Sequence, residues 1–316
     1  MGRTAPAADR FDRSIAESSD AEARRESANS RGLVTHTFVV EAPGEYAEAV
    51  ARLVELAWSQ RRSLFFEAVA EHWTWRQVGP HLSDPELRHL VAHSRVLRGE
   101  DLARASGSLG PELFGDIPFA LQTWEAEFWD VENSPMSYGR HGSAGGFDGI
   151  PVHDVTARVG LPLPDTGATA LTWTAPPPLP SWATNSGSYA EVAGPLHCTA
   201  AQALARHLSG LPRHERLTQA VPVPFAAAYP GLLKALGGQG AYTSESMALG
   251  RIAVWRLLRR MARLPDDSPA DTVSEHVAGL DCLTWELPGD DIWYFHLAAD
   301  HPATGTSWLV DGQDFD

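Results

Sequence analysis

Apolar side chains recur at helical spacing through much of the first half of the chain. Residues 45–58 and 64–73 place them every three or four positions, which predicts two amphipathic helices. The same period continues over 118–129, where we expect another helix. The runs at 35–40 and 168–174, which are rich in β-branched and aromatic residues, instead predict strands. The first half of the chain is therefore expected to be mostly helical.

The second half changes from a helical to a strand pattern near residue 280. Four helices are expected, over residues 199–208, 229–236, 244–263 and 270–277. The apolar positions then alternate, which predicts three strands, over residues 282–287, 292–298 and 307–310. Turns at Pro288–Asp290 and Pro302–Gly305 leave short connections, which favour an antiparallel meander. The expected fold class is α+β, a mostly helical N-terminal part followed by C-terminal helices packed on a small antiparallel β-meander.

Composition divides the chain into three parts. Residues 1–32 contain few large apolar side chains, so we expect a disordered tail. A glycine-rich stretch at 139–149 and a proline-rich stretch at 175–188 are expected to be irregular. We place a boundary near residue 180, between an α-rich region at 33–180 and an α+β domain at 181–316. Whether these two regions share one core is left open.

Charge is distributed unevenly along the chain. It has 40 acidic and 25 basic side chains, a formal net charge of −15, and Lys234 is its only lysine. No lysine or arginine follows Arg263, whereas residues 264–316 contain twelve carboxylates. This balance disfavours a nucleic-acid-binding protein, which needs a basic surface to displace counterions from phosphate. We expect the acidic C-terminal segment to fold back onto the arginine-rich helix at 244–263 and pair with its guanidinium groups.

Missing motifs exclude several classes of protein. The only lysine, Lys234, does not stand in a P-loop motif, and we expect it at the surface. The chain also lacks the Gly-x-Ser-x-Gly motif and a Gly-x-Gly-x-x-Gly motif that follows a strand. Cys198 and Cys282 lack Cys-x-x-Cys spacing, which suggests two thiols in a reducing compartment. No apolar run is long enough for a signal peptide or a membrane span. We expect a soluble, cytoplasmic protein, with no cofactor predicted other than the transition metal considered below.

The helix predicted over 244–263 has the strongest single pattern in the chain. Its apolar stripe predicts a face that packs into the core. Arg251 and Trp255 lie one turn apart on a second face, and Arg256 lies on a third. One interpretation is that these arginines pair with the acidic C-terminal segment. The other is that Arg251, Trp255 and Arg256 bind an anion or a flat ligand.

A candidate metal pair lies on the helix expected to open with Ser83-Asp-Pro-Glu, a capping box in which Ser83 caps the first turn. His89 and His93 follow at the spacing that brings two imidazoles within reach of one transition metal. A third ligand would come from elsewhere, with His72 and His141 as candidates. The alternative is that both histidines are boundary residues of an ordinary helix.

A second chemical candidate follows the aromatic run Trp293-Tyr-Phe. In a strand, His296 and Trp293 face opposite sides. Asp300 could orient His296 or His301, as a carboxylate orients a general base. The alternative is a core strand that ends in a polar turn.

Part of the chain resembles an uncharacterised family of actinomycete proteins. The matching features are a Gly-Ala-Tyr segment ending at Tyr242, a Gly-Arg-x-x-x-Trp-Arg helix at 250–256, and the aromatic strand 293–296 followed by Asp311-Gly-Gln-Asp314. The resemblance covers about residues 225–316 and implies a bacterial, intracellular protein of unknown function. Together with the patterns of the helix at 244–263 and the strand at 292–298, these features give the candidates for ligand or partner binding: Tyr242, Arg251, Trp255, Arg256, Trp293, His296 and Asp300.

Two classes of function fit these patterns, and whether the protein is an enzyme is left open. We favour a binding or regulatory protein whose acidic C-terminal sheet meets a basic protein partner, because no catalytic motif is complete. The alternative is an enzyme, such as a metal-assisted hydrolase, that uses His89 with His93 or His296 with Asp300. No nucleic-acid or membrane partner is expected, and the oligomeric state is not predicted.

Overall fold

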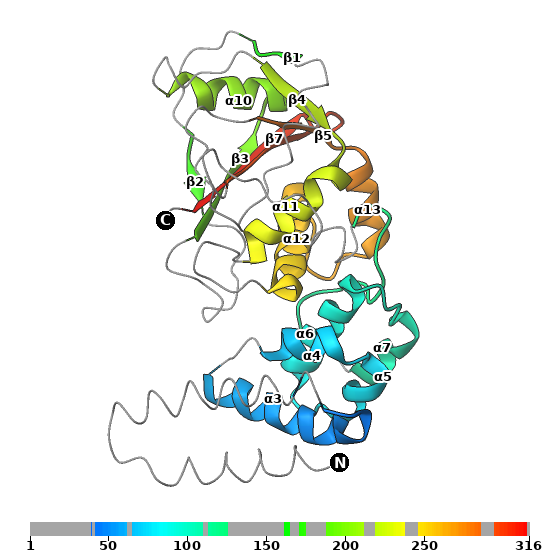
Figure 1. Cartoon of the computed structure of the whole chain (residues 1–316). Coiled ribbons are helices and arrows are strands. Elements are labelled where there is room, and N and C mark those ends of the chain that lie inside the picture. Colours follow the sequence, from blue (N-terminus) through cyan, green and yellow to red (C-terminus); the bar gives the residue numbers. More distant parts are fainter. Residues whose placement is uncertain are drawn as a thin grey trace, which may run out of the picture. The chain divides into compact units, whose positions relative to one another are not determined.

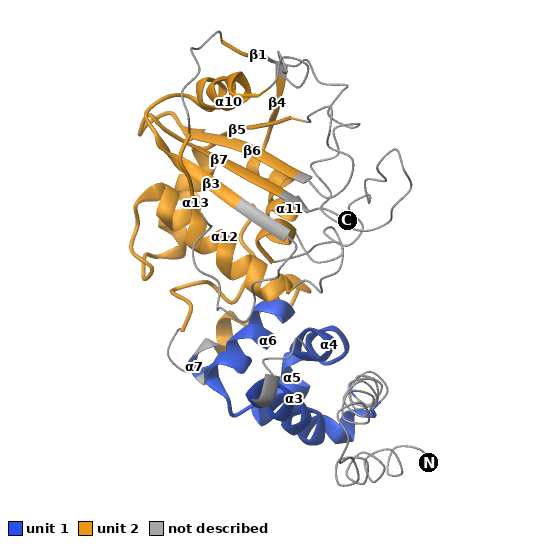
Figure 2. Ribbon diagram, turned by 90° about the vertical axis from the view of Figure 1, so that its left-hand side faces the viewer, with its two compact units in different colours: residues 1–95, 107–110 blue, residues 96–106, 111–316 orange. Residues whose placement is uncertain are grey.

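The computed structural model describes residues 39, 42–61, 65–109, 113–125, 161–164, 171–174, 188–211, 219–237, 246–285 and 294–314. The chain divides into two compact units, residues 1–95 with 107–110 and residues 96–106 with 111–316 (Figures 1 and 2). The division falls near residue 95 rather than near residue 180, because strands on both sides of residue 180 belong to one sheet. None of the helices described is long and apolar enough to cross a membrane.

The first unit is built from helices. Its elements are η1 (Gly44–Tyr46), α3 (Ala47–Arg61), α4 (Phe65–His72), α5 (Trp75–Val78), η2 (Gly79–His81), α6 (Pro85–Leu97), whose last residues belong to the second unit, and α7 (Ser106–Leu109). The helices α3 and α4 confirm the two predicted at 45–58 and 64–73. Their apolar stripes meet in the core, where the buried rings of Trp58 and Phe66 pack edge to face with centroids 5.7 Å apart.

The helix α6 begins with Asp84 as its cap rather than Ser83. The Asp84 carboxylate accepts the backbone N–H of Leu87 at 2.9 Å. The Ser83 hydroxyl instead donates to Glu55 of α3 at 2.8 Å, and Glu55 also accepts the N–H of Asp84 at 2.9 Å. The predicted cap is therefore wrong by one residue, because Glu55 engages Ser83. The strand predicted at 35–40 lies outside the described residues except for Val39.

The second unit contains a seven-stranded antiparallel sheet. Its strands are β1 (Leu161–Pro162), β2 (Trp173–Thr174), β3 (Ser188–Leu196), β4 (Gln219–Val223), β5 (Asp281–Thr284), β6 (Tyr294–His301) and β7 (Thr306–Asp314). Their order across the sheet is β1-β4-β5-β6-β7-β3-β2. The run β5-β6-β7 confirms the predicted meander. The strands β3 and β4, which the sequence pattern did not predict, extend it on both sides.

Helices cover both faces of this sheet (Figure 2). They are α10 (Ala200–Ser209), α11 (Phe225–Gly237), α12 (Met247–Ala262) and α13 (Ala270–Ala278), and the unit also contains the short η3 (Ala103–Ala105). The four α-helices confirm those predicted for the second half of the chain. On one face α10 packs Leu204 and Leu208 against Leu283, Ala298 and Leu309. On the other face lie α11, α12 and α13, so the unit has a helix–sheet–helix arrangement, and the predicted α+β class is confirmed.

The helices α11 and α12 lie unusually close together. A Cβ atom added at Gly250 of α12 would lie 2.3 Å from the carbonyl oxygen of Leu233 and 3.2 Å from the Cα of Gly237, both on α11. Because α11 lies between α12 and the sheet, its C-terminal half is buried on all sides. This burial includes Lys234, which is 5% exposed. The expectation that Lys234 lies at the surface is wrong.

Residues 118–125 are not helical, in contrast to the helix predicted at 118–129. They end in a turn, in which the Glu125 carboxylate accepts the N–H of Gln122 at 3.0 Å and the Glu125 N–H donates to the Gln122 carbonyl at 3.0 Å. Phe119 and Trp124 are buried. The helical spacing of the apolar residues thus reflects tertiary packing of a non-helical segment. Residues 126–129 lie outside the described part of the chain.

Candidate functional site

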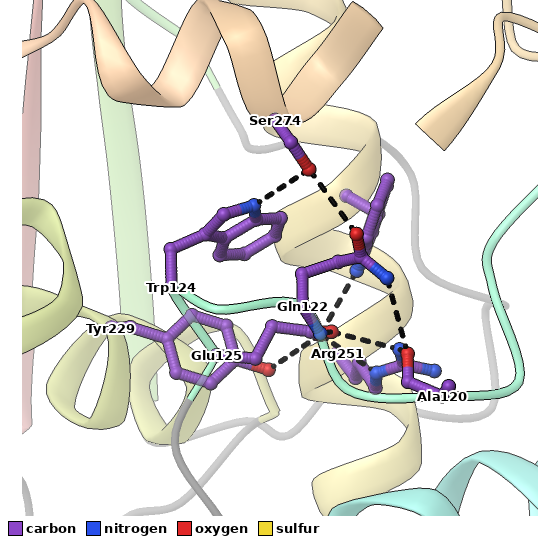
Figure 3. A network of polar contacts seen from close by, with 8 residues as sticks. Ala120, Gln122, Trp124, Glu125, Tyr229, Arg251 and Ser274 are labelled. Carbon is purple, nitrogen blue, oxygen red and sulfur yellow. Dashed lines mark hydrogen bonds and ion pairs between the residues drawn. The ribbon is translucent and has the colours of Figure 1, made fainter. Parts of the chain in front are cut away.

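A buried polar network ties the turn at 122–125 to α11 and α12 (Figure 3). Its centre is the Glu125 carboxylate, whose side chain is fully buried. Glu125 Oε1 accepts hydrogen bonds from Tyr229 Oη at 3.1 Å, Arg251 Nε at 2.8 Å and Trp255 Nε1 at 3.0 Å. Glu125 Oε2 accepts a second bond from Arg251, through Nη2 at 2.9 Å, as well as the N–H of Gln122.

The Glu125 carboxylate influences the protonation of both Arg251 and Tyr229. Burial lowers the pKa of Arg251, but the Glu125 carboxylate more than offsets this effect, and the net pKa is raised. Burial and then Glu125 raise the pKa of Tyr229 well above its usual value, so its hydroxyl stays a donor. A buried carboxylate with this many donors is an internal cross-link. Arg251 and Trp255, which we predicted as ligand-binding residues, are both engaged in it.

Two other arginines of α12 contact neutral oxygen atoms, while Asp266 of the acidic C-terminal segment acts electrostatically on Arg256 and Arg259. Arg259 is fully buried, and its Nη2 donates to the main-chain carbonyls of Asp116 at 2.6 Å and Ser268 at 3.3 Å. Arg260 Nη2 donates to the Thr174 hydroxyl at 3.3 Å. The physical reason is that two loops and the strand β2 supply carbonyl and hydroxyl oxygens at this surface of α12. In these contacts the guanidinium groups bind neutral oxygen atoms.

Three further residues were predicted to bind a ligand or partner, and the structure describes one of them, Arg256. The Arg256 guanidinium lies 5.8 Å from the centroid of the Phe114 ring. Burial lowers the pKa of Arg256, while Asp266 acts in the opposite direction. Tyr242 and Trp293 lie outside the described residues.

The two histidines predicted as metal ligands are fully buried on α6. His89 Nδ1 lies 2.7 Å from the Pro85 carbonyl oxygen, one helical turn earlier. Burial is the main cause that lowers the pKa of His89. Within the described ranges, no group of three or more His, Cys, Asp or Glu side chains could hold a metal ion. His89 and His93 therefore gain no third ligand from those residues, and His141 lies outside them.

The sheet brings His296 and Asp311 together. They are direct partners across β6 and β7, and His296 Nδ1 lies 2.8 Å from Asp311 Oδ1. His296 is 3% exposed, whereas the Asp311 side chain is 19% exposed. The carboxylate is thus the more exposed partner of the pair.

Aromatic and imidazole rings surround this pair on the α10 side of the sheet. Trp285, which follows β5, is stacked on His296 with centroids 5.0 Å apart and planes 10° apart. His207 of α10 lies 6.3 Å from Trp285 and packs edge to face against Trp173 of β2 at 5.2 Å. Burial lowers the pKa of His207, Asp311 raises it and His296 lowers it further. Five elements therefore place two imidazoles, two indoles and one carboxylate in a single cluster.

Asp300 does not orient His296. Four residues along a strand separate them by roughly 13 Å. The Asp300 carboxylate instead accepts the N–H of Ala200 at 2.8 Å and anchors the first turn of α10. Burial and then Asp281 raise the pKa of Asp300, against the effect of that hydrogen bond. The residue that orients His296 is Asp311.

Sequence reasoning missed Asp311, His207 and Trp285 as members of the cluster. The position of Asp311 could have been predicted from the sequence, because a hairpin that turns at Pro302–Gly305 places it opposite His296. His207 and Trp285 have no local signal, since tertiary packing of α10 and β5 brings their rings together.

Comparisons with known proteins give a family but no activity. No curated protein and no solved structure matches the chain. A family model described as "Family of unknown function (DUF6183)" matches residues 10–301. This match begins far before the 225–316 segment in which we noted a resemblance to an uncharacterised family, and it ends at residue 301. The chain belongs to the family of unknown function DUF6183.

Proposed function

We propose that this chain is an enzyme that transfers protons through His296, with Asp311 as the positioning residue. The observation that supports it is the 2.8 Å contact between His296 Nδ1 and Asp311 Oδ1 within a cluster of rings. A carboxylate that accepts from Nδ1 fixes the tautomer of the imidazole and makes Nε2 its basic nitrogen. Such an imidazole takes a proton from a substrate or a water molecule and returns it to a leaving group.

The surroundings of the pair favour a substrate with a flat or apolar group and little negative charge. Trp285 and Trp173 supply aromatic surface beside the imidazoles. Asp311 lies opposite the exposed Glu191 across β7 and β3. Two neighbouring carboxylates repel an anionic substrate. An uncharged ester or amide therefore fits this site better than a phosphate.

The experiment measures hydrolysis of 4-nitrophenyl acetate, an uncharged ester with a flat ring. We expect His296→Gln to lower the rate by about 100-fold and Asp311→Asn by about 10-fold, because general acid–base groups contribute on this scale. The control is His72→Gln, the same substitution at an exposed histidine of α4, and it should keep the wild-type rate.

Circular dichroism verifies that each variant is folded. A folded His296→Gln protein with the wild-type rate contradicts the proposal, as does a wild-type rate no higher than that of free imidazole. If His296→Gln does not fold, a folded Asp311→Asn protein with the wild-type rate has the same meaning.

A second candidate function is binding of a basic protein partner. Five carboxylates before, on and after α13 are exposed, and among the described residues none of them forms an ion pair; they are Asp266, Asp267, Asp271, Glu275 and Asp281. Asp266 and Asp267 also act electrostatically on arginines of α12, and the remaining exposed negative charge on and after α13 would speed association with a cationic surface. An actinomycete origin is part of this second proposal, supported by the lysine-poor, arginine-rich composition, and so is a cytoplasmic location, supported by the free thiols of Cys198 and Cys282.

Salt dependence tests this second candidate with a defined probe. We expect binding to polylysine at 50 mM salt to weaken by at least about 10-fold at 500 mM, since surface charges are screened within a few ångströms there. Replacing Asp271 and Glu275 by Asn and Gln should weaken it further. Equal binding at both salt concentrations contradicts an electrostatic partner site on α13.

A further inference from the structure

Two histidines outside the candidate site are stacked on each other. His276 lies in the last turn of α13 and His301 ends β6, and their rings are parallel within 1° with centroids 4.6 Å apart. Within the part of the chain that the structure describes, His276 Nε2 and His301 Nδ1 are buried and have no hydrogen-bond partner. The two rings therefore hold α13 against the sheet by direct contact.

The stack fits tightly against the end of α13. A Cβ atom added at Gly279, the residue that caps the helix, would lie 2.6 Å from His301 Nε2. The imidazole of His301 thus rests on the backbone where α13 ends. No side chain could be accommodated between them without moving the ring or the helix.

The charged groups around the stack come from several elements. On α13, Glu275 precedes His276 and is exposed; on β5 and β6, Asp281 and Asp300 face each other as partners. Asp300 also interacts electrostatically with His301. On β7, the partner of His301 is Thr306, which is uncharged.

The remaining neighbour is α12, which packs against α13 and has two arginines in its last turn. Arg259 donates to main-chain carbonyls, and Arg260 donates to Thr174 and lies over Trp308.

The pKa of His276 is lowered to about 4 by two causes, burial first and the charge of His301 second. The C-terminus of a helix raises the pKa of a partly buried histidine by at most about 1.5, so it does not reverse this effect.

The helix α13 also holds the turn that carries Glu125. The Ser274 hydroxyl accepts the indole N–H of Trp124 at 3.1 Å and donates to the side-chain oxygen of Gln122 at 3.3 Å (Figure 3). Ser274 lies two residues before His276 on the same short helix. A displacement of the last turn of α13 would therefore break both contacts with the turn at 122–125.

We propose that His276 and His301 form an acid-sensitive latch that holds α13 against the sheet, and that its opening releases the turn at 122–125. Two stacked imidazoles tolerate at most one positive charge, because two cations at this distance repel each other in a buried setting. Acid therefore favours an open form in which the rings separate and become hydrated. This device couples the pH of the surroundings to the segment that supports the buried network.

The direction of the effect follows from the two pKa values of His276. In the open form its pKa is near the ordinary 6.5, whereas in the closed form it is about 4. Between these values only the open form binds the proton, so the latch is fully stable above pH 6.5 and weakens as the pH falls toward 4. Acid acts in the opposite direction on Asp300, whose raised pKa makes protonation favour the closed form.

Hydrogen exchange of the full chain, corrected for the intrinsic pH dependence of exchange, tests the latch. We expect the amides of residues 273–278 and the indole N–H of Trp124 to lose protection by about 10-fold between pH 7.5 and 5.0. In His276→Phe, which keeps a stacked ring but cannot be protonated, this pH dependence should disappear. The control His72→Phe makes the same change at an exposed histidine and should retain it.

Each result either supports the latch or overturns it. Equal protection at both pH values in the wild type overturns it, as does an unchanged pH dependence in folded His276→Phe. If that variant does not fold, His276→Gln, which likewise cannot be protonated in this pH range, is measured in its place, with the same outcomes. Loss of protection at 273–278 without a change at Trp124 overturns the proposed coupling to the turn at 122–125.

Discussion

Glu125 and Arg251 form a buried ion pair between residues that are 126 positions apart in the sequence, with both side chains fully excluded from solvent. The pair is bidentate, through Nε at 2.8 Å and Nη2 at 2.9 Å. Glu125→Gln removes the negative charge and leaves the guanidinium buried without it. We expect a loss of about 3–5 kcal/mol in the free energy of unfolding, the usual cost of breaking a buried pair from one side.

Denaturant unfolding measures this loss. The control is Glu48→Gln, which breaks an exposed ion pair with Arg52 on α3 and should change the free energy by less than about 0.5 kcal/mol. The double variant Glu125→Leu with Arg251→Met should be more stable than Glu125→Gln, because it leaves no buried charge. A single Glu125→Gln variant as stable as the wild type would mean that the network does not hold the unit together.

The contrast between His296 and Glu125 shows what local patterns can predict. Counting outward from a turn at Pro302–Gly305 pairs His301 with Thr306 and, five positions further, His296 with Asp311. The His296 partner was therefore predictable from the strand pattern and the turn. Glu125 was not, because its segment has helical spacing but no helix, and its partners lie on helices more than a hundred residues later.

The strand β3 was missed for a similar reason. It contains Gly194-Pro195, which interrupts the β-rich pattern, and its long partner is β7, at the far end of the chain. Its register shifts between Ala193 and Leu196, where an alternating pattern also breaks. The helix α12, by contrast, was predicted to within three residues at each end, because one unbroken apolar stripe defines it. Local periodicity specifies such an element, while long-range pairing specifies β3.

Gly250→Ala should destabilise the protein, although alanine normally stabilises a helix relative to glycine by about 1 kcal/mol. The new methyl group would lie 2.3 Å from the Leu233 carbonyl oxygen, so α11 and α12 must separate. We expect a net loss of about 1–3 kcal/mol in the free energy of unfolding. Gly107→Ala on α7 is the control, since nothing lies within 4 Å of its added Cβ. An equally stable Gly250→Ala protein would contradict the close packing of the two helices.

Only one of the two cysteines should react in the native protein. Cys282 is 4% exposed, and burial raises the pKa of its thiol to about 12, so almost none of it is thiolate at pH 8. Cys198 is half-buried, with its sulfur 3.5 Å from the Ser307 hydroxyl. Mass spectrometry after treatment with iodoacetamide at pH 8 should find modification at Cys198 at least about 100-fold faster than at Cys282. Denatured protein provides the control, in which both thiols react. Comparable native rates would contradict the burial of β5.

Asp300 and Asp311 lie on the same hairpin and should have separable roles. Asp300→Ala removes the acceptor for the Ala200 N–H and should cost about 1 kcal/mol of stability, as loss of a helix cap does. Asp300→Asn, which keeps an acceptor oxygen, should cost less. Neither change should alter the rate of 4-nitrophenyl acetate hydrolysis, because Asp300 does not contact His296.

Asp311→Asn should have the opposite effect, with a lower rate of hydrolysis at a nearly unchanged free energy of unfolding. A lower rate in folded Asp300→Ala would show that the carboxylate on β6 takes part in the chemistry, and would contradict the assignment of Asp311 as the residue that orients His296.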